Sequence, residues 1–402
     1  MTNTNDAAVS REAMPETTVE FLCAVCSHRA AFDVISYSSY PTFLFPLPPA
    51  LAPDVVRAPL TLTVCRRCGH FQLPTVDPDI QRLIYEVYYS HYEIDSLETM
   101  IPAYREPFNQ MIESLAADGL LSKGRLLEIG CSSGAMIPFL TRFCSSYTGV
   151  DPSERIDLAR AQYPQHTFIH SYFPSPELQG PFDVAVTQFN LEHIENAGTF
   201  VDGLAAIMRP GAVLLVQVPD AGYFLHTEQP NFLAHEHVHY FRAAQLAMLL
   251  ASRGFAVERW GENGPSIICA ARRSDTAIAP IEIVDPLADA IVLRELAMTV
   301  PPLPRRPVLY GVGLTLHWLL VMVPSLATEA TVVDDNPSYL GKGVPGYDLL
   351  IQKPSSELFE GRDVVLTLNA IYHERVLERL RTLGASCVVH RMSEHGWTTC
   401  SL

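Results

Sequence analysis

A strand followed by a glycine-bracketed turn is the feature that most narrows the fold of this chain. Residues 126–129 form a short apolar run of strand length, Gly130 and Gly134 bracket the turn after it, and residues 135–143 have a helical pattern. Glycines let the backbone approach a ligand closely, and the start of a helix offers free N–H groups. This unit predicts an α/β domain with a ligand-binding loop at the end of its first strand.

Two acidic residues indicate what that loop binds. Glu128 lies just before Gly130, and Asp151 ends a second strand about twenty residues further on, where an acid is placed to hold the hydroxyls of a ribose. The acid before the first glycine, in the form E/D-x-G-x-x-x-G, favours S-adenosylmethionine (SAM) over a dinucleotide, whose fingerprint is G-x-G-x-x-G. We therefore expect a SAM site that includes Glu128, Gly130, Cys131, Gly134 and Asp151. The alternative is an ordinary tight turn.

Further apolar runs of strand length recur along the chain, at residues 147–150, 168–170, 184–187, 213–218, 308–310, 330–333, 363–368 and 387–390. Segments of helical length separate most of them, and this alternation argues for parallel sheets with crossover helices. Four prolines between positions 301 and 307 end a predicted helix at 286–298. The sequence therefore predicts an N-terminal module at 1–78, a nucleoside-binding α/β domain at 79–273, and a linker helix with a C-terminal α/β domain at 274–402.

Two C-x-x-C pairs lie in the N-terminal module, and they comprise Cys23, Cys26, Cys65 and Cys68. Two residues between cysteines let one tight turn direct both sulfurs at a single ion, and four thiolates suit tetrahedral zinc. The pattern predicts a structural zinc site with no open position for catalysis. Buried cysteines or a redox dithiol are the alternatives.

Charge and hydropathy exclude several classes of function. The 28 lysines and arginines oppose 44 aspartates and glutamates, and the net charge of −16 repels phosphate backbones and anionic membranes. No apolar stretch reaches the roughly 18 residues of a membrane span, and residues 1–20 lack the basic head and apolar core of a secretory signal. We expect a cytoplasmic protein that binds a small molecule and neither nucleic acid nor membrane. Its oligomeric state is open, and a monomer is compatible with three domains.

Polar residues follow the predicted strand at 184–187. Gln188, Asn190 and His193 come directly after it, and ligands of open α/β sheets lie at the carboxyl ends of the strands. We expect Gln188 and Asn190 at the cofactor and His193 in the catalytic site, with a packing or capping role as the alternative for the histidine.

A histidine-rich segment follows the strand at 213–218. It contains His235, Glu236, His237 and His239 within five positions. Histidine titrates near neutral pH and a carboxylate can orient it, so this is a natural place for a general base. The H-x-H pattern with an acid could instead bind a catalytic metal, and a solvated loop is the third possibility.

Taken in order, these motifs resemble the zinc-containing C-methyltransferases that act on nucleotide-linked keto-sugars in antibiotic biosynthesis. The resemblance covers nearly the whole chain, and its motifs lie at residues 23–26, 65–73, 85–90, 126–134, 190–194, 235–241, 310–313, 333–337 and 341–346. It implies a class I SAM-methyltransferase Rossmann-like domain, flanked by a small N-terminal zinc-binding module and a second, C-terminal Rossmann-like domain that helps to hold a nucleotide-linked deoxysugar.

The resemblance also implies a mechanism. A base removes a proton from the carbon next to a ketone, and the enolate attacks the methyl group of SAM. By position, His237 would be the base, Glu236 would orient it, and His193 would assist at the carbonyl oxygen or carry a second proton. Tyr88 would lie near the donor.

The chain also departs from the pattern of the family. Ala234 stands where the sugar enzymes usually carry a tyrosine, and residues 314–320 are bulky and apolar. These departures keep open methylation of another carbon acid, or of an oxygen or nitrogen of another secondary metabolite. A zinc-bearing regulator without activity is a third hypothesis, which the acidic charge disfavours for any role on nucleic acid.

Overall fold

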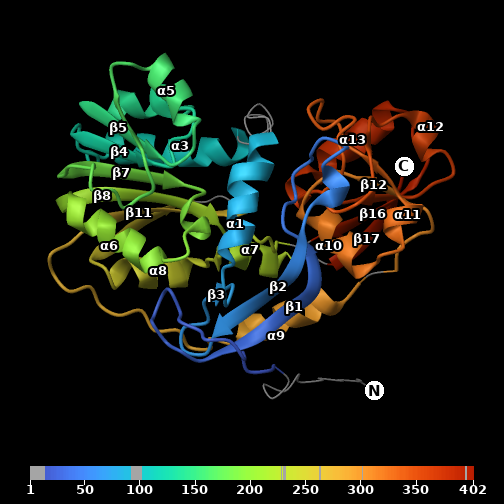
Figure 1. The fold of residues 1–402 in the computed structure, drawn as a ribbon, viewed down its shortest axis with the longest axis horizontal. Coiled ribbons are helices and arrows are strands. Elements are labelled where there is room, and N and C mark those ends of the chain that lie inside the picture. Colours follow the sequence, from blue (N-terminus) through green and yellow to red (C-terminus); the bar gives the residue numbers. More distant parts are fainter. Residues whose placement is uncertain are drawn as a thin grey trace.

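Three β-sheets organise the part of the chain that the computed structural model describes, which comprises residues 14–91, 102–227, 229, 232–261, 264–300, 302–393 and 396–402. Figure 1 shows the middle sheet on one side, the C-terminal sheet on the other, and the long N-terminal hairpin between them. In the described part, no helix is long and apolar enough to span a bilayer.

The N-terminal sheet contains strands from two distant parts of the chain. Its order is β1-β2-β3-β9, with antiparallel pairing throughout, and its strands are β1 (Ala31–Pro41), β2 (Arg57–Cys65), β3 (Phe71–Gln72) and β9 (His239–Tyr240). β9 follows the histidine-rich segment, so pairing of Gln72 with His239 fixes that segment against the N-terminal module. The domain boundaries at 78 and 273 stay predictions, and this pairing crosses the first of them.

The middle sheet has seven strands in the order β10-β11-β8-β7-β4-β5-β6. The five predicted strands are confirmed as parallel neighbours, at β4 (Arg125–Ile129), β5 (Ser146–Asp151), β6 (Thr167–His170), β7 (Phe182–Gln188) and β8 (Met208–Pro219). An antiparallel hairpin, β10 (Phe255–Gly261) and β11 (Ser266–Arg273), completes the sheet and was not predicted. The helices are α3 (Pro102–Ala117), α4 (Ile137–Leu140), α5 (Ile156–Gln162), α6 (Ala197–Ile207), α7 (Ala221–His226) and α8 (Ala243–Ala251).

The helix after the glycine loop is shorter than predicted. The pattern at 135–143 predicted one continuous helix, whereas α4 spans Ile137–Leu140 and continues as a 3-10 turn at Thr141–Phe143. Gly134 has a φ of +82°, a left-handed conformation that ends the loop, and the helix begins three residues after it with Met136 as its N-cap.

The C-terminal sheet has six strands in the order β14-β13-β12-β15-β16-β17. Its bounds are β12 (Val308–Tyr310), β13 (Thr331–Val333), β14 (Ile351–Gln352), β15 (Val364–Leu366), β16 (Val388–Ser393) and β17 (Gly396–Ser401), with β17 alone antiparallel to its neighbour among the described strands. Its helices are α10 (Leu314–Met322), α11 (Leu326–Glu329), α12 (Ser356–Phe359) and α13 (His373–Thr382), and α9 (Ala288–Met298) is the linker helix.

One apolar core joins the N-terminal sheet to the C-terminal domain. Tyr40 and Leu62 of the hairpin share it with Trp318 and Leu319 of α10 and with Leu293 of α9, all at most 1% exposed. Because α10 is apolar on every side and the linker helix closes the same core, the hairpin is buried on this face. The N-terminal sheet therefore connects the two α/β units, and the short helix α1 (Pro78–Arg82) leads from it toward the middle domain (Figure 1).

Candidate active site

The glycine loop after β4 has the backbone that its sequence predicts. Gly130 and Gly134 have φ of +79° and +82°, and Ser132 between them has φ of 44°. A Cβ atom on Gly130 would lie 3.2 Å from Nδ2 of Asn190, which comes from the end of β7. Glycine is therefore required for both the backbone angle and the space, and Asn190 lies directly over the loop.

Asp151 at the end of β5 holds this loop in place. Its Oδ2 accepts a hydrogen bond from the N–H of Ser132 (2.8 Å), and its Oδ1 accepts from the N–H (2.8 Å) and the hydroxyl (2.5 Å) of Ser153. A carboxylate offers about four lone-pair sites, and these donors use three of them. One lone-pair site remains for a ribose hydroxyl. Asp151 would therefore accept a single hydrogen bond from the ribose diol unless Ser153 moves.

Glu128 is a buried carboxyl at the base of the loop. It is 5% exposed, and the Tyr147 hydroxyl donates to its Oε2 at 2.5 Å. Burial raises the pKa of Glu128 to about 8, so the group carries a proton at neutral pH. Cys131 is buried beside it, and burial raises the pKa of its thiol. These two residues shape the loop, and a neutral thiol there is no nucleophile.

Gln188 belongs to the same edge of the sheet. Its Nε2 donates to Oε1 of Gln217 at 2.8 Å, and Asn190 Nδ2 reaches the Thr187 hydroxyl at 3.4 Å. The glycine loop, Asp151, Gln188 and Asn190 thus lie at the carboxyl ends of three adjacent strands, β5, β4 and β7, where ligands of open α/β sheets bind. This edge fits a nucleoside ligand, although its role in SAM binding stays a prediction.

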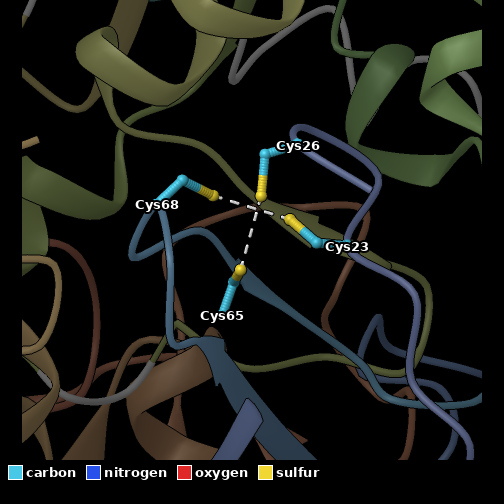
Figure 2. Close-up of side chains that lie close together, drawn as sticks. All are labelled: Cys23, Cys26, Cys65 and Cys68. Atoms are coloured by element: carbon cyan, nitrogen blue, oxygen red, sulfur yellow. Dashed lines mark hydrogen bonds between the residues drawn. The ribbon is translucent and has the colours of Figure 1, made fainter. Parts of the chain in front are cut away.

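The four N-terminal cysteines converge on one point, as Figure 2 shows. The sulfur atoms of Cys23 and Cys68 are 3.6 Å apart, as are those of Cys26 and Cys65, and all four lie within 4.8 Å of one another. Four sulfurs at about 2.3 Å from a tetrahedral zinc are about 3.8 Å apart. The residues therefore fit a zinc ion with four thiolate ligands and no open position.

This cluster is connected to the middle domain by two side chains at the start of α8. Gln245 Nε2 donates to the carbonyl oxygen of Cys68 at 2.7 Å, and Arg242 donates to that of Gly69 at 2.8 Å. Arg242 also pairs with Asp289 of α9. The cysteine cluster is thus anchored to both the middle domain and the linker helix.

Two histidines predicted for catalysis lie side by side. The ring centroids of His193 and His237 are 4.9 Å apart in an edge-to-face arrangement. His193 Nδ1 lies 2.8 Å from the carbonyl oxygen of Glu236 and 3.1 Å from the Tyr85 hydroxyl. Because a carbonyl oxygen only accepts, Nδ1 carries a proton and donates it, so in the neutral tautomer Nε2 is the nitrogen with the lone pair. Burial and the neighbouring His193 hold the pKa of His237 well below its usual range, so His237 is neutral at pH 7.

Glu236 has a different partner from the one expected. Its Oε2 accepts a hydrogen bond from the Tyr89 hydroxyl at 2.6 Å, and the Tyr89 ring stacks on Tyr85 with centroids 5.7 Å apart. The prediction that the Glu236 carboxylate orients His237 is not supported by these contacts. The residue contributes through its backbone, whose carbonyl oxygen orients His193.

Tyr85 and Tyr89 were not singled out as site residues by the sequence analysis, which assigned Tyr88 of the same cluster to the donor site. The Tyr88 hydroxyl accepts from the N–H of Val56 at 3.1 Å, and its ring packs on Phe43 with centroids 5.4 Å apart. Tyr88 therefore packs against the N-terminal module, and its expected contact with the methyl donor gains no support. The irregular helical turn at Leu83–Tyr88 gives the tyrosines different directions, which sequence spacing alone does not reveal.

The three histidines of the histidine-rich segment separate. His235 is buried against the backbone of Tyr40 and Ala58 in the N-terminal sheet, His237 meets His193, and His239 Nδ1 lies 3.2 Å from His70 Nε2. Within the described residues, His235, Glu236 and His237 do not converge on a common point as metal ligands. The histidines of the H-x-H pattern lie apart, so a metal site built from that pattern alone gains no support from these contacts.

Comparison with known proteins agrees with this geometry. Residues 99–259 match the family described as a methyltransferase domain. C-methyltransferase NovU of Streptomyces niveus is 25% identical over 249 residues, which cover 58% of this chain and 56% of that protein. The ubiquinone biosynthesis O-methyltransferase of Caulobacter sp. (strain K31) is 32% identical over 99 residues, covering 23% of this chain and 39% of the relative. The chain thus spans about half or less of the length of these relatives.

Among solved structures, magnesium protoporphyrin IX methyltransferase from Synechocystis PCC 6803 with bound S-adenosylhomocysteine is similar to this chain with a TM-score of 0.36 and 21% identity, over 43% of this chain and 84% of that one. The strand order gives the middle domain the class I Rossmann-like fold, and most of this domain lies within the segment that matches the methyltransferase domain family. This confirms the fold class that the sequence predicted.

Proposed function

We propose that this chain is a SAM-dependent methyltransferase that methylates a carbon next to a ketone. The observation that carries the proposal is the pair His193 and His237, which combines a neutral imidazole with a second, backbone-oriented one. The turn that holds His193 begins at Asn190, the residue that lies against Gly130 of the glycine loop in the segment that matches a methyltransferase domain. Carbon attack on a methyl group requires an enolate, and an enolate requires both a base and a group that stabilises charge on oxygen.

Each group has a separate part in the reaction. His237, kept neutral by its low pKa, takes the proton from the α-carbon. His193, held through Nδ1 by the Glu236 carbonyl oxygen, takes up a proton from solvent at Nε2 before the reaction and donates a hydrogen bond from it to the ketone oxygen, and it keeps that proton when the carbonyl is restored. The α-carbon electron pair then forms the bond to the SAM methyl group as the sulfur–methyl bond breaks, and S-adenosylhomocysteine leaves.

The donor would be held by the glycine loop with Asp151, Gln188 and Asn190. SAM supplies an electrophilic methyl group on a sulfonium sulfur. Zinc held by the four cysteines would be structural, because four thiolates leave no position for substrate.

The acceptor that we propose is a nucleotide-linked keto-deoxysugar. The relative named as a C-methyltransferase favours a carbon acceptor. In the C-terminal domain, Asp334 at the end of β13 accepts from the N–H groups of Val312 (2.9 Å) and Asn336 (2.8 Å). This is the pattern that Asp151 makes with Ser132 and Ser153, so the second α/β unit repeats the loop geometry of a nucleoside site.

A second candidate is methyl transfer to oxygen. The relatives named as ubiquinone O-methyltransferases are about as similar as the first relative, over a shorter stretch. The keto-sugar C-methyltransferases that this chain resembles usually carry a tyrosine at the position of Ala234. Here the Tyr240 hydroxyl accepts a hydrogen bond from the N–H of Ala234 and donates one to its carbonyl oxygen. An oxygen acceptor needs one base and no enolate.

The test uses purified protein, SAM and a nucleotide-linked 4-keto-6-deoxyhexose in deuterated water, with mass spectrometry of the sugar. We expect one methyl group on carbon, together with deuterium at the α-position when SAM is omitted. His237→Gln should lose about 10²–10⁴-fold in rate, whereas His170→Gln, an exposed histidine of the same domain, should retain the rate. Methylation without α-exchange, at a site cleaved by mild hydrolysis, would support the oxygen acceptor.

A further inference from the structure

A second group of potential metal ligands lies beside the proposed base. Three atoms lie within 4.8 Å of one another: a carboxylate oxygen of Glu192, a ring nitrogen of His193 and a ring nitrogen of His237. Glu192 and His193 come from the 3-10 turn Leu191–His193, and His237 comes from the loop before β9. This group is separate from the cysteine cluster.

The buried Glu192 carboxyl has one oxygen without a hydrogen-bond partner among the described residues. It is 1% exposed, its Oε2 has no hydrogen-bond partner among the described residues, and its Oε1 lies 3.8 Å from His193 Nε2. Burial raises the pKa of this carboxyl to about 7. A buried carboxylate without a partner is costly, and a bound cation would offset that cost.

The two imidazoles are prepared to bind an ion. His193 already donates its Nδ1 proton to the carbonyl oxygen of Glu236 at 2.8 Å. Such a backbone bond is the usual way in which a metal-binding histidine is oriented, with the opposite nitrogen directed at the ion. His237 is neutral and so has a lone pair to offer. Two imidazole nitrogens and one carboxylate suit zinc, cobalt and related divalent ions.

We propose that Glu192, His193 and His237 form a second divalent-cation site, and that an ion bound there inhibits methyl transfer. The inhibition rests on the proposed function, because the ion takes the lone pair with which His237 removes the substrate proton. Ligand atoms around tetrahedral zinc are about 3.4 Å apart, and the 3.8 Å between Glu192 and His193 is somewhat wider. The site therefore has to contract around its ion and binds more weakly than the four cysteines.

The experiment counts ions. Purified protein, with the zinc that it retains, is dialysed against Co²⁺, and both metals are measured by elemental mass spectrometry. We expect two ions per chain in the wild type and in Glu195→Gln, an exposed neighbour, and one in Glu192→Gln at the same Co²⁺ concentration. Titration should show affinity for the second ion at least about 10-fold lower in Glu192→Gln. As a measurement that needs no variant, Co²⁺ should broaden the imidazole NMR signals of His193 and His237.

Activity is then measured against Co²⁺, with each protein compared with its own rate before Co²⁺ is added. Wild-type turnover should fall in step with the second ion, and Glu192→Gln should require at least about 10-fold more Co²⁺ for the same loss. One ion per chain in the wild type, or equal affinity in both proteins, would overturn the site. A second ion that leaves turnover unchanged would overturn the inhibition. Ion counting needs no methyl acceptor, so failure of the proposed function leaves this result intact and recognisable.

Discussion

Replacing His239 by phenylalanine tests how the N-terminal module positions the turn that holds His193. His239 Nε2 lies 3.0 Å from the carbonyl oxygen of Ile194 and 3.3 Å from that of Glu195. Carbonyl oxygens only accept, so Nε2 carries the proton. Burial lowers the pKa of His239 to about 4, so the ring is neutral and its Nδ1 accepts from His70 Nε2 at 3.2 Å. The direction of both bonds is therefore determined.

The magnitude follows from what phenylalanine leaves behind. His70 and His239 are 0% and 2% exposed, so the His70 N–H and the Ile194 carbonyl oxygen both lose their partner away from water. Each unsatisfied buried group costs about 1–3 kcal/mol, so His239→Phe should cost about 2–6 kcal/mol. The carbonyl oxygen of Glu192 is held separately by the N–H of Val238 at 2.8 Å. We expect the turn to loosen from its Ile194 end, which shifts His193 against His237.

Amide hydrogen exchange measures this loosening directly. At the lower limit of 2 kcal/mol, the amides of residues 191–195 and 238–240 should exchange about 30-fold faster. His170→Phe is the matched control, because His170 is exposed and binds a single carbonyl oxygen in the same domain, so it should change stability by less than about 0.5 kcal/mol.

A double variant separates the loss of the hydrogen bond between His70 and His239 from a loss of packing. In His70→Phe/His239→Phe the unsatisfied N–H is absent, so the two single losses should not add, and the coupling should be about 1–3 kcal/mol. Additive losses, or unchanged exchange at residues 191–195 in His239→Phe, would refute the reasoning.

Three further predictions follow from the site. Glu128→Gln should flatten the dependence of the unfolding free energy on pH. Because the pKa of Glu128 is raised, its contribution to stability is complete below the unfolded pKa near 4.5 and is lost as pH rises through about 8. The unfolding free energy measured by urea titration should therefore fall over that window in the wild type only. Asp151→Asn should weaken SAM binding in calorimetry by about 10-fold or more, since an amide cannot accept from both Ser132 and Ser153, while Asp157→Asn, an exposed neighbour, should not. The low pKa of His237 places the rising limb of the pH–rate profile below its ordinary value of about 6.5, and a limb above 7 would contradict its role as base.

The sequence predicted those parts of the fold that depend on local pattern. Strands at 126–129 and 147–150, the left-handed glycines and the acid at Asp151 follow from hydrophobic runs and backbone preference, both of which act over a few residues. The hairpin β10–β11 was missed because residues 266–273 pair antiparallel with β8 and are buried on both faces, so they show no alternation. Pairing of β3 with β9 joins residues about 170 positions apart, and no local signal encodes that.

The site was predictable to a similar extent. The strand end predicted a site role for His193 and the family resemblance predicted one for His237, and the structure brings the two rings together, although their catalytic roles stay predictions. The spacing of the cysteines predicted a cluster that the structure confirms as a convergence of four sulfurs. Partners could not be predicted in the same way. Glu236 contacts Tyr89 rather than His237, and Tyr88 of the same cluster contacts Val56 instead of the site. These contacts depend on how distant segments pack, which the residue types of either segment do not encode.

The pairing of β3 with β9 connects the module with the four cysteines to the proposed catalytic histidines. His237 lies two residues before β9, and both carbonyl oxygens that flank His193 are held from β9 or the residue before it, through Val238 and His239. β9 in turn pairs with β3, three residues beyond Cys68. The distance between base and oxygen-stabilising group is therefore fixed by a strand pair that the cysteine cluster anchors. It follows that removal of zinc by a chelator should reduce kcat before it affects SAM affinity, because the glycine loop and Asp151 belong to the middle sheet and make their bonds without the N-terminal module. Equal loss of both would show that the module supports the whole domain and not the catalytic turn.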